Sequence, residues 1–391
     1  MKAIINTKLI LEDGIIFDGA ITFDKGRILQ AGPAHTVTIP EDAEVIDAKG
    51  LYTAPGLIDL HNHGCGDYLY YENPDYCSRH FLKHGQTTVL PTLYSNVSLE
   101  DMLAGADRIR KASTAGAGKI IGGLYMEGPY MNSDGSYQSS MKWNGPIDKK
   151  DYTRLISGLG DLVRVWAVDP IREGIDEFIE YAKENTPHAC FAYGHTDATA
   201  ADCRRVRHHG FTLQTHWGDT GSAPGRAQGT PGAGVDQYAL YDPELYSEVI
   251  CDEIGIHVVP DLIKMLIRAK GVEHVCLITD SMCSRENFKN NEEAGIWYGP
   301  DLNYDDEGCL AGSRLTLDNA CRNLMVHTGY GLCHAIRMAT LNPAKVLKLD
   351  QQLGSIAPGK IANLIIIDDT VNIRSVFLEG ELAVQDGELL V

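Results

Sequence analysis

The sequence predicts an α/β fold: a (β/α)8 barrel of the TIM type, with a small β-sandwich domain formed by both chain termini. Three observations support this prediction. The middle of the chain alternates short apolar runs with stretches of helical spacing, which is typical of a parallel sheet. Eight such units span about 300 residues, near the roughly 250 residues usual for this barrel. Both ends of the 391-residue chain are rich in short strands and turn signals.

The chain ends have the pattern of a separate β domain. Near the start, Asp-Gly and Lys-Gly pairs, which favour hairpins, separate the β-like stretches Ile4–Leu11, Gly14–Phe17, Ala20–Asp24 and Arg27–Gly32. Near the other end, the strand-like stretches and turn signals are Ala362–Ile367, Ile373–Leu378, Glu379-Gly380 and Asp386-Gly387. We therefore expect one small domain made of residues 1–53 and 354–391, and a barrel made of residues 54–353.

The middle region contains eight candidate strands. They lie near Gly56–His61, Gln86–Thr92, Ile120–Glu127, Val163–Val168, Ala189–His195, Phe211–His216, Ser247–Gly255 and His274–Asp280. Helical patterns follow several of them, for example at Ile175–Glu184 and Ala200–His209. Strand number alone leaves a doubly wound open sheet as an alternative. No GxGxxG motif follows the first strand, which disfavours a dinucleotide-binding version of that sheet.

Composition excludes several classes of partner. The chain has 34 Lys plus Arg against 53 Asp plus Glu, a net charge of −19, and no basic run, so nucleic acid and anionic membranes are poor partners. The longest apolar runs, such as Leu364–Ile367, are far shorter than the ~20 residues of a membrane span. Ten scattered cysteines without a CxxC pair suit free thiols in a reducing cytoplasm. These features predict a cytoplasmic protein that binds neither nucleic acid nor a membrane.

Five candidate strands end in residues that bind metals or transfer protons. In chain order these residues are His61 with His63, Glu127, His195, His216 and Asp280. The carboxyl ends of barrel strands gather at one rim, where catalytic residues lie. A single histidine in an apolar strand is more often structural than functional. The repetition at five strand ends therefore predicts a shared site.

Imidazoles and carboxylates are suitable ligands for Zn²⁺, Fe²⁺, Mn²⁺ or Co²⁺, and such an ion lowers the pKa of bound water. His61 and His63 share one face of an extended chain, because side chains two residues apart point the same way. Glu127 can then ligate one ion or bridge two, which leaves Asp280 as a general base. Considered one at a time, each carboxylate also has a structural interpretation. Glu127 could form a structural ion pair, and Asp280 could cap the N-terminus of the following segment.

Several motifs match known families. Residues 54–64, APGLIDLHNHG, resemble the first-strand signature of the amidohydrolase superfamily. Further segments resemble the N-acetylglucosamine-6-phosphate deacetylase family within it, nearly to the end of the chain. They are Met126–Asn132, Gly194–Thr199, Thr215-His216, Gly255–Val258, Leu277–Asp280, Leu310–Leu317, Arg337–Ala344 and Leu353–Leu364.

This resemblance implies a metal-dependent deacetylase with a barrel and a small β-sandwich, acting as a homodimer. The main metal ligands of the family match Glu127, His195 and His216. His61 and His63 match the pair that completes a second site in two-metal members. Asp280 matches the catalytic acid–base. The metal is expected to be zinc, as one or two ions, with iron, manganese or cobalt as alternatives.

The resemblance also implies a substrate, N-acetylglucosamine 6-phosphate, which would yield glucosamine 6-phosphate and acetate. His257 matches a histidine that contacts the substrate, and Arg226 lies near the place of an arginine that reaches the substrate phosphate across a dimer interface. The loop containing Leu310 and Gly312 matches a loop that lies over the acetyl group.

Two segments depart from the family pattern. The usual His-x-x-Asn-Ala-Met, whose amides help to bind phosphate, is replaced by His216-Trp217-Gly218-Asp219-Thr220-Gly221-Ser222. Gln138–Trp143 replaces the usual Lys-Gly-Ala-His, so a substrate-contacting histidine is absent. Two alternatives therefore stay open: an amidohydrolase for a different acylated amine or cyclic amide, and a barrel that binds metal or ligand without catalysis. The sequence leaves the role of Trp217–Ser222 undecided.

Overall fold

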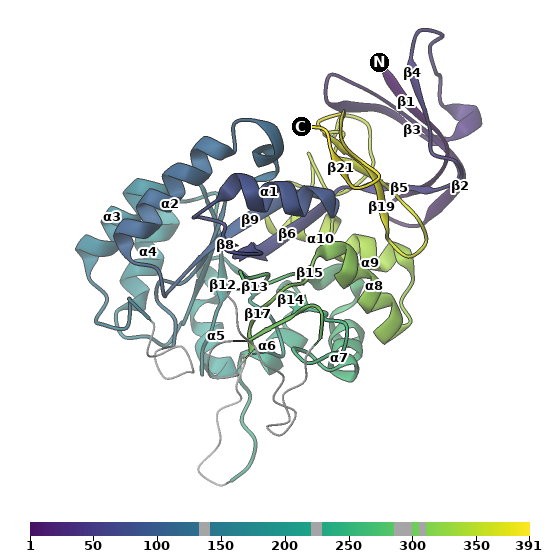
Figure 1. The fold of residues 1–391 in the computed structure, drawn as a ribbon. Coiled ribbons are helices and arrows are strands. Elements are labelled where there is room, and N and C mark those ends of the chain that lie inside the picture. Colours follow the sequence, from purple (N-terminus) through teal and green to yellow (C-terminus); the bar gives the residue numbers. More distant parts are fainter. Residues whose placement is uncertain (133–140, 220–228, 285–298, 305–309) are drawn as a thin grey trace.

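The computed structural model describes residues 1–132, 141–219, 229–284, 299–304 and 310–391 (Figure 1). Eight parallel strands follow one another around the barrel in chain order. They are β6 (Leu57–Asn62), β9 (Gln86–Tyr94), β10 (Leu124–Glu127), β11 (Val163–Val168), β12 (Cys190–Tyr193), β13 (Phe211–Gln214), β14 (Tyr246–Ile250) and β15 (Val275–Ile278). The (β/α)8 prediction is confirmed.

Hydrogen bonds between the first and last strands close the barrel. Just after β15, the Asp280 N–H donates to the His61 carbonyl at 2.9 Å, and the His63 N–H donates to the Ser281 carbonyl at 2.8 Å. Asn62 and Ser281 form a parallel bridge. The alternative of an open, doubly wound sheet is therefore wrong. Closure matters for function, because it brings the end of β6 beside the end of β15.

The barrel helices begin where local sequence favours a cap. The side chains of Asn73, Ser98, Asp148 and Thr199 each accept a hydrogen bond from a first-turn N–H. The helices are α1 (Pro74–Lys83), α2 (Leu99–Ala112), α3 (Lys149–Leu159), α4 (Ile175–Asn185), α5 (Ala200–Val206), α6 (Val235–Tyr241), α7 (Pro260–Lys270), α8 (Leu317–Thr328), α9 (Leu332–Met338) and α10 (Leu341–Val346). Among the described residues, none of these helices is long and apolar enough to cross a membrane.

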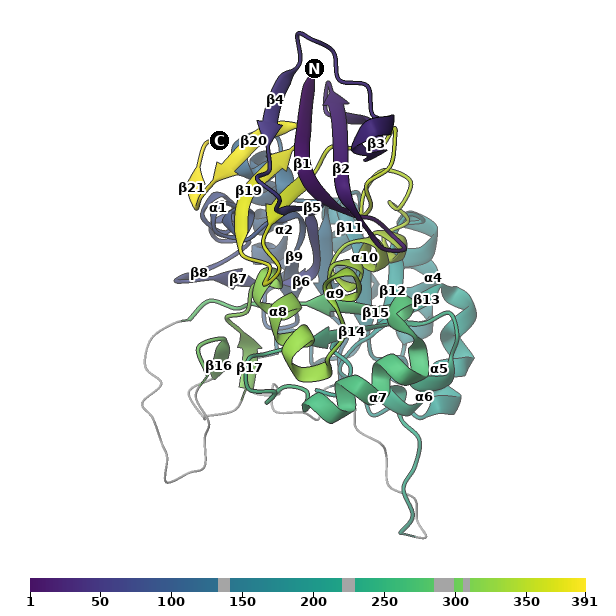
Figure 2. The ribbon, with the colours of Figure 1, turned by 90° about the vertical axis from the view of Figure 1, so that its right-hand side faces the viewer.

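The two chain ends share one sheet of nine strands, seen together in Figure 2. Its strands are β1 (Lys2–Ile10), β2 (Ile15–Asp24), β3 (Arg27–Pro33), β4 (Glu44–Asp47), β5 (Tyr52–Pro55), β18 (Leu364–Ile367), β19 (Ile373–Leu378), β20 (Glu381–Gln385) and β21 (Glu388–Leu389). Strand β5 lies between β1 and β18, so it joins the two ends. A β domain built from both termini is thus confirmed, with its strands in one continuous sheet.

Short elements complete the described fold. They are the strands β7 (Gly64–Cys65), β8 (Tyr68–Leu69), β16 (Leu302–Tyr304) and β17 (Leu310–Ser313), and the 3₁₀ helices η1 (Ala34–Thr36), η2 (Gly116–Ile120), η3 (Arg207–His209) and η4 (Val272–His274). Strand β17 pairs with β16 and also bridges to Ser281 after β15. It therefore lies beside the barrel rim that carries Asp280.

Local turn chemistry was predicted well at several turn signals, including Lys25-Gly26, and wrongly at one. At Glu379-Gly380 and Asp386-Gly387 both residues have positive φ, which is the conformation of a type I′ hairpin turn. Asp18-Gly19, however, forms no turn. The predicted strands on either side of it are one strand, β2, in which a register shift opposite Thr7 accommodates the pair.

Several predicted barrel strands were too long, and the largest overruns were at β10 and β14. The segment beginning at Ile120 starts as 3₁₀ helix, and the strand itself begins at Leu124, after Gly123 with φ +141°. Strand β14 ends at Ile250, because the Gly255 N–H turns back to the Asp252 carbonyl. Both errors arise at turns that apolar periodicity does not reveal.

The small domain has its own core, shared by both chain ends. The rings of Phe23 and Phe377 meet edge to face with centroids 5.8 Å apart, and Phe377 is 1% exposed. We expect Phe377→Ala to lower the free energy of unfolding by about 3–5 kcal/mol, since it opens a cavity in this core. Phe17→Ala is the matched control, because Phe17 in the same sheet is 73% exposed. Equal denaturation midpoints for the two variants would contradict a shared core.

Candidate metal centre

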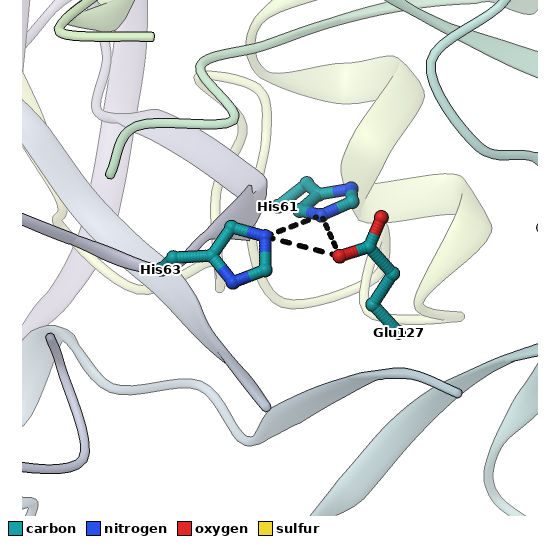
Figure 3. A group of neighbouring side chains, drawn as sticks. All are labelled: His61, His63 and Glu127. Atoms are coloured by element: carbon teal, nitrogen blue, oxygen red, sulfur yellow. Dashed lines mark hydrogen bonds and ion pairs between the residues drawn. The ribbon is translucent and has the colours of Figure 1, made fainter. Parts of the chain in front are cut away.

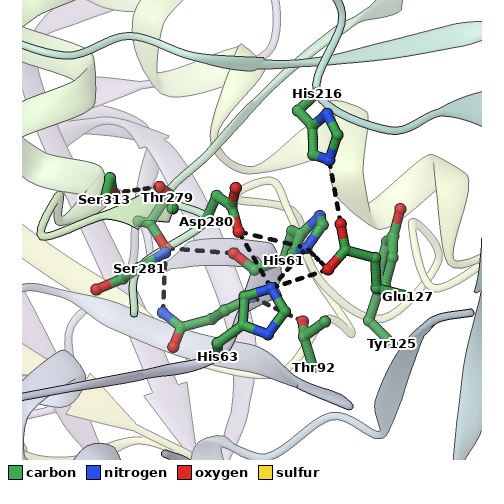
Figure 4. A network of polar contacts seen from close by, with 12 residues as sticks. His61, His63, Thr92, Tyr125, Glu127, His216, Thr279, Asp280, Ser281 and Ser313 are labelled. Atoms are coloured by element: carbon green, nitrogen blue, oxygen red, sulfur yellow. Dashed lines mark hydrogen bonds and ion pairs between the residues drawn. The ribbon is translucent and has the colours of Figure 1, made fainter. Parts of the chain in front are cut away.

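The six predicted rim residues converge at the carboxyl ends of the barrel strands, and all of them except His195 are labelled in Figure 4. His61 is within β6 and Glu127 is the last residue of β10, whereas the other four lie one or two residues after strands β6, β12, β13 and β15. These four are His63, His195, His216 and Asp280. His195 is half-buried and the other five are buried. Rigid strands therefore hold all six side chains around one small volume.

Glu127 lies at the centre of this group. Its Oε1 is 3.0 Å from His195 Nε2 and 3.1 Å from His216 Nε2. Its Oε2 is 3.2 Å from His63 Nε2 and 3.7 Å from His61 Nε2. Figure 3 shows these three side chains facing one another. The two carboxylate oxygens thus face two different pairs of imidazoles. We call these the His61/His63 half-site and the His195/His216 half-site.

The spacing of these atoms fits a metal ion in each half-site. In each half-site the three donor atoms, one of them from Glu127, lie within 4.8 Å of one another. Ligands held tetrahedrally about 2.0–2.1 Å from an ion are about 3.3 Å apart, close to the distances above. Nitrogen and oxygen donors also suit a first-row divalent ion. The residues present therefore fit one or two metal ions, with Glu127 between them.

Asp280 borders the His61/His63 half-site. Its Oδ1 is 3.2 Å from His63 Nε2 and 3.5 Å from His61 Nε2. Its φ is +48°, and the Ser313 N–H donates to its carbonyl at 2.8 Å. Gly312 approaches so closely that a Cβ there would lie 2.6 Å from the same carbonyl oxygen. Strand β17 thus fixes the unusual backbone that aims the Asp280 carboxylate into the site.

The site attracts positive charge. Burial favours a raised pKa for Glu127, but the charge of His61 and hydrogen bonds from His195 and His216 outweigh it and hold that pKa well below its usual range. For Asp280, the charge of His61 and the hydrogen bond with His63 likewise outweigh burial and lower the pKa. Both carboxylates are therefore ionised near neutrality.

The histidine pKa values shift in the opposite direction. Burial favours a lower pKa for His216, but its hydrogen bond with Glu127 and the charge of that carboxylate raise the pKa to about 9. The pKa of His63 is also raised, because its hydrogen bonds with Asp280 and Glu127 outweigh the effect of burial. The carboxylates thus favour a cation between the imidazoles, either protons or a metal ion. Metal binding at neutral pH should therefore release protons.

The predicted substrate residues are only partly brought together. His257 is buried, with Nδ1 3.2 Å from Asp252 Oδ2 and Nε2 3.2 Å from the Gly312 carbonyl oxygen. It therefore contacts the β17 loop that contains Leu310 and Gly312, beside Asp280. Arg226 lies outside the described residues, as do residues 138–140 and 220–222, so nothing is assigned to them structurally.

The described part of the Trp217–Ser222 segment has two different roles. Trp217 is buried and its indole N–H donates to the Asp236 carbonyl at 3.1 Å, so it is part of the packing. Asp219 instead faces the site, with Oδ2 4.0 Å from His216 Nδ1. An acidic group therefore stands next to one candidate ligand of the His195/His216 half-site.

Sequence reasoning missed two buried carboxylates behind the site. Asp59 accepts hydrogen bonds from Asn62, Gln86 and Thr279, and so connects β6, β9 and the segment after β15. Its burial raises its pKa to about 6. Glu248 lies in β14 behind His61. The available signal was a lone acidic residue within an apolar strand, in LIDLHN and YSEVI.

Comparisons with known proteins agree with this geometry. The sequence profile of the amidohydrolase family matches residues 52–383. The N-acetylgalactosamine-6-phosphate deacetylase of Escherichia coli O157:H7 is 28% identical over 96% of this chain and 97% of that relative. The N-acetylglucosamine-6-phosphate deacetylase of Haemophilus influenzae is 24% identical over 97% of this chain and 98% of that relative. The structure of the corresponding Pasteurella multocida enzyme superimposes with a TM-score of 0.84, at 25% identity over 97% of this chain and 99% of that one.

Proposed function

This chain belongs to the amidohydrolase family, and we propose that it hydrolyses the N-acetyl amide of an amino-sugar 6-phosphate, first of all N-acetylglucosamine 6-phosphate, to glucosamine 6-phosphate and acetate. One observation carries the proposal: both half-sites share Glu127, and Asp280 lies beside them. Deacetylases that match nearly the whole chain support this substrate class over other amides. They include enzymes named for the glucosamine and for the galactosamine sugar.

In this proposal Glu127, His195 and His216 hold one divalent ion, and His61 and His63 complete the site of a second. A bound ion supplies Lewis-acid polarisation of the amide carbonyl and lowers the pKa of water. The arrangement of the protein donors fixes where that polarisation acts. Donor spacing in both half-sites and the low pKa of Glu127 support these assignments.

Asp280 acts as base and then as acid. Its ionised carboxylate takes a proton from the water that attacks the amide carbonyl carbon, so that a new C–O bond forms. It then gives this proton to the amide nitrogen as the C–N bond breaks, because an amine is a poor leaving group without it. The contacts of Asp280 with His61 and His63 support this placement. His257 orients a sugar hydroxyl or the developing oxyanion, and Leu310 and Gly312 cover the acetyl group.

A substrate panel tests the proposal. We expect the highest kcat/KM on N-acetylglucosamine 6-phosphate or its C4 epimer, and a loss of at least about 10²-fold on unphosphorylated N-acetylglucosamine, since charge-assisted contacts to phosphate are then unmade. Activity confined to an acylated amino acid or a cyclic amide would contradict the substrate. Absence of product with every substrate and metal would instead favour a barrel that binds without catalysis.

We further propose zinc as the metal, a homodimer as the assembly and the cytoplasm as the location. The nitrogen and carboxylate donors support zinc, although iron, manganese and cobalt use the same ligands. Arg226 supports the dimer, because its expected phosphate contact crosses between subunits. The nine described cysteines are all free thiols, which supports a reducing compartment. A monomer in light scattering would remove the role given to Arg226.

A further inference from the structure

Glu248 contacts both half-sites from behind. Its side chain is fully buried in β14, at 0% exposure. Its Oε2 lies 3.4 Å from His61 Nδ1, 3.3 Å from the backbone nitrogen of His216 and 3.4 Å from the Tyr125 hydroxyl. One oxygen atom therefore contacts the side chain of one candidate ligand and the main chain of another. Glu248 itself is in neither group of candidate metal ligands.

We propose that Glu248 is a positioning residue of the metal centre: it fixes the proton of His61 on Nδ1 and holds the backbone turn at His216, so that each imidazole presents Nε2 to its own half-site. This inference rests on the metal centre proposed above. The inference adds to that metal centre a residue that contacts neither the metal nor the substrate.

The orientation of His61 supports the first half of the proposal. Its Nε2 points to the site, 3.2 Å from His63 Nε2 and 3.7 Å from Glu127 Oε2. A neutral imidazole that ligates through Nε2 must carry its proton on Nδ1, and the acceptor opposite Nδ1 is Glu248. The Tyr125 ring stacks on His61, with centroids 4.4 Å apart, and restrains the ring plane.

The backbone of His216 supports the second half. Its φ is +26°, a conformation that is uncommon for residues other than glycine. The His216 N–H donates to Glu248 Oε2, and the next N–H, of Trp217, donates to the Glu248 carbonyl at 2.8 Å. Glu248 therefore satisfies two successive amides of this turn. This backbone conformation directs the His216 ring toward Glu127.

Charge gives Glu248 a role that packing alone would not. Among the residues that the structure describes, His61 is its one partner within ion-pair distance. A buried carboxylate is costly unless a positive charge compensates it. When His61 donates its Nε2 lone pair to a cation, its Nδ1–H becomes a stronger donor to Glu248. The Glu248 carboxylate should therefore stabilise the metal-bound protein more than it stabilises the metal-free protein.

The test is metal affinity. Zinc is removed from the full-length protein with a chelator, and Zn²⁺ is then titrated in the presence of a competing indicator. We expect Glu248→Gln to weaken binding of the ion in the His61/His63 half-site by about 10–100-fold, the usual effect of removing such a partner. Glu244→Gln is the matched control, since it removes the same charge from an exposed residue just before β14. It should stay within about twofold of wild type.

Two further measurements separate positioning from folding. The melting temperatures of the zinc-depleted proteins show whether Glu248→Gln is folded. If Glu248→Gln does not fold, Glu248→Asp takes its place, because it keeps the negative charge but moves it away from His61. This variant should lose less than about 100-fold in metal affinity and should bind the wild-type number of ions. Wild-type affinity for every ion in a folded Glu248→Gln protein would overturn the inference. A wild-type chain that binds no divalent ion would overturn the metal centre itself.

Discussion

Asp280→Asn should lower kcat by about 10²–10⁴-fold while leaving metal content and substrate KM nearly unchanged. This is the usual range for the loss of a general acid–base. The amide keeps the size of the carboxylate and can still accept from His63, but it cannot take a proton from water or return one to the amine. The carbonyl and N–H of residue 280 bond to Ser313 and His61 through the backbone, so the substitution leaves those contacts in place.

The measurement is steady-state deacetylation together with metal analysis of the same samples. Unchanged metal with lost turnover would assign the loss to proton transfer. Near wild-type kcat would overturn the acid–base role of Asp280. A parallel loss of metal would make Asp280 a ligand of the His61/His63 half-site instead, since its Oδ1 lies 3.2 Å from His63 Nε2.

Glu127→Gln should have the largest effect on metal binding of any single substitution in the site. Both half-sites use this carboxylate, one through each oxygen. An amide has one ligating oxygen, and removal of its negative charge leaves four imidazoles close together. Leaving the buried positive charge of the ion without this carboxylate costs about 3–5 kcal/mol, which is about 10²–10⁴-fold in affinity. Activity should fall with the metal content.

His63→Asn and His195→Ala are the comparison variants for Glu127→Gln, because each removes a ligand from one half-site only. Each should lower the affinity of one ion and spare the other. Metal analysis and titration of the three variants together therefore test whether Glu127 is shared. A Glu127→Gln protein that loses only one ion would place the carboxylate in a single half-site.

The barrel could be predicted because most of its strands contain a short apolar run that is buried, and helical spacing follows several of them. The six rim residues could be proposed because parallel strands place their carboxyl ends together, so that position along the chain implies proximity in space. The structure brings these six together. Their individual roles as ligands or acid–base stay predictions.

Other features depend on contacts that no local pattern encodes. Glu248 and His61 are 187 residues apart, and their contact exists only because the barrel closes. A single acid in an apolar strand has the same pattern whether it faces solvent or a buried imidazole. The left-handed backbone of Asp280 depends likewise on β17, which follows it at a distance in the chain. Tertiary closure, not local propensity, sets these details.

The sheet shared by both chain ends has a consequence for synthesis on the ribosome. Strand β5 needs β18 as its neighbour, yet about 300 residues must be translated between them, which takes about 15–60 s at 5–20 residues per second. Until then the edge of β5 and the apolar face that Phe377 later covers stay open to other chains. The barrel, by contrast, can close as soon as β15 emerges. The nascent chain thus carries an incomplete first domain, with an unpaired strand edge, for most of its synthesis.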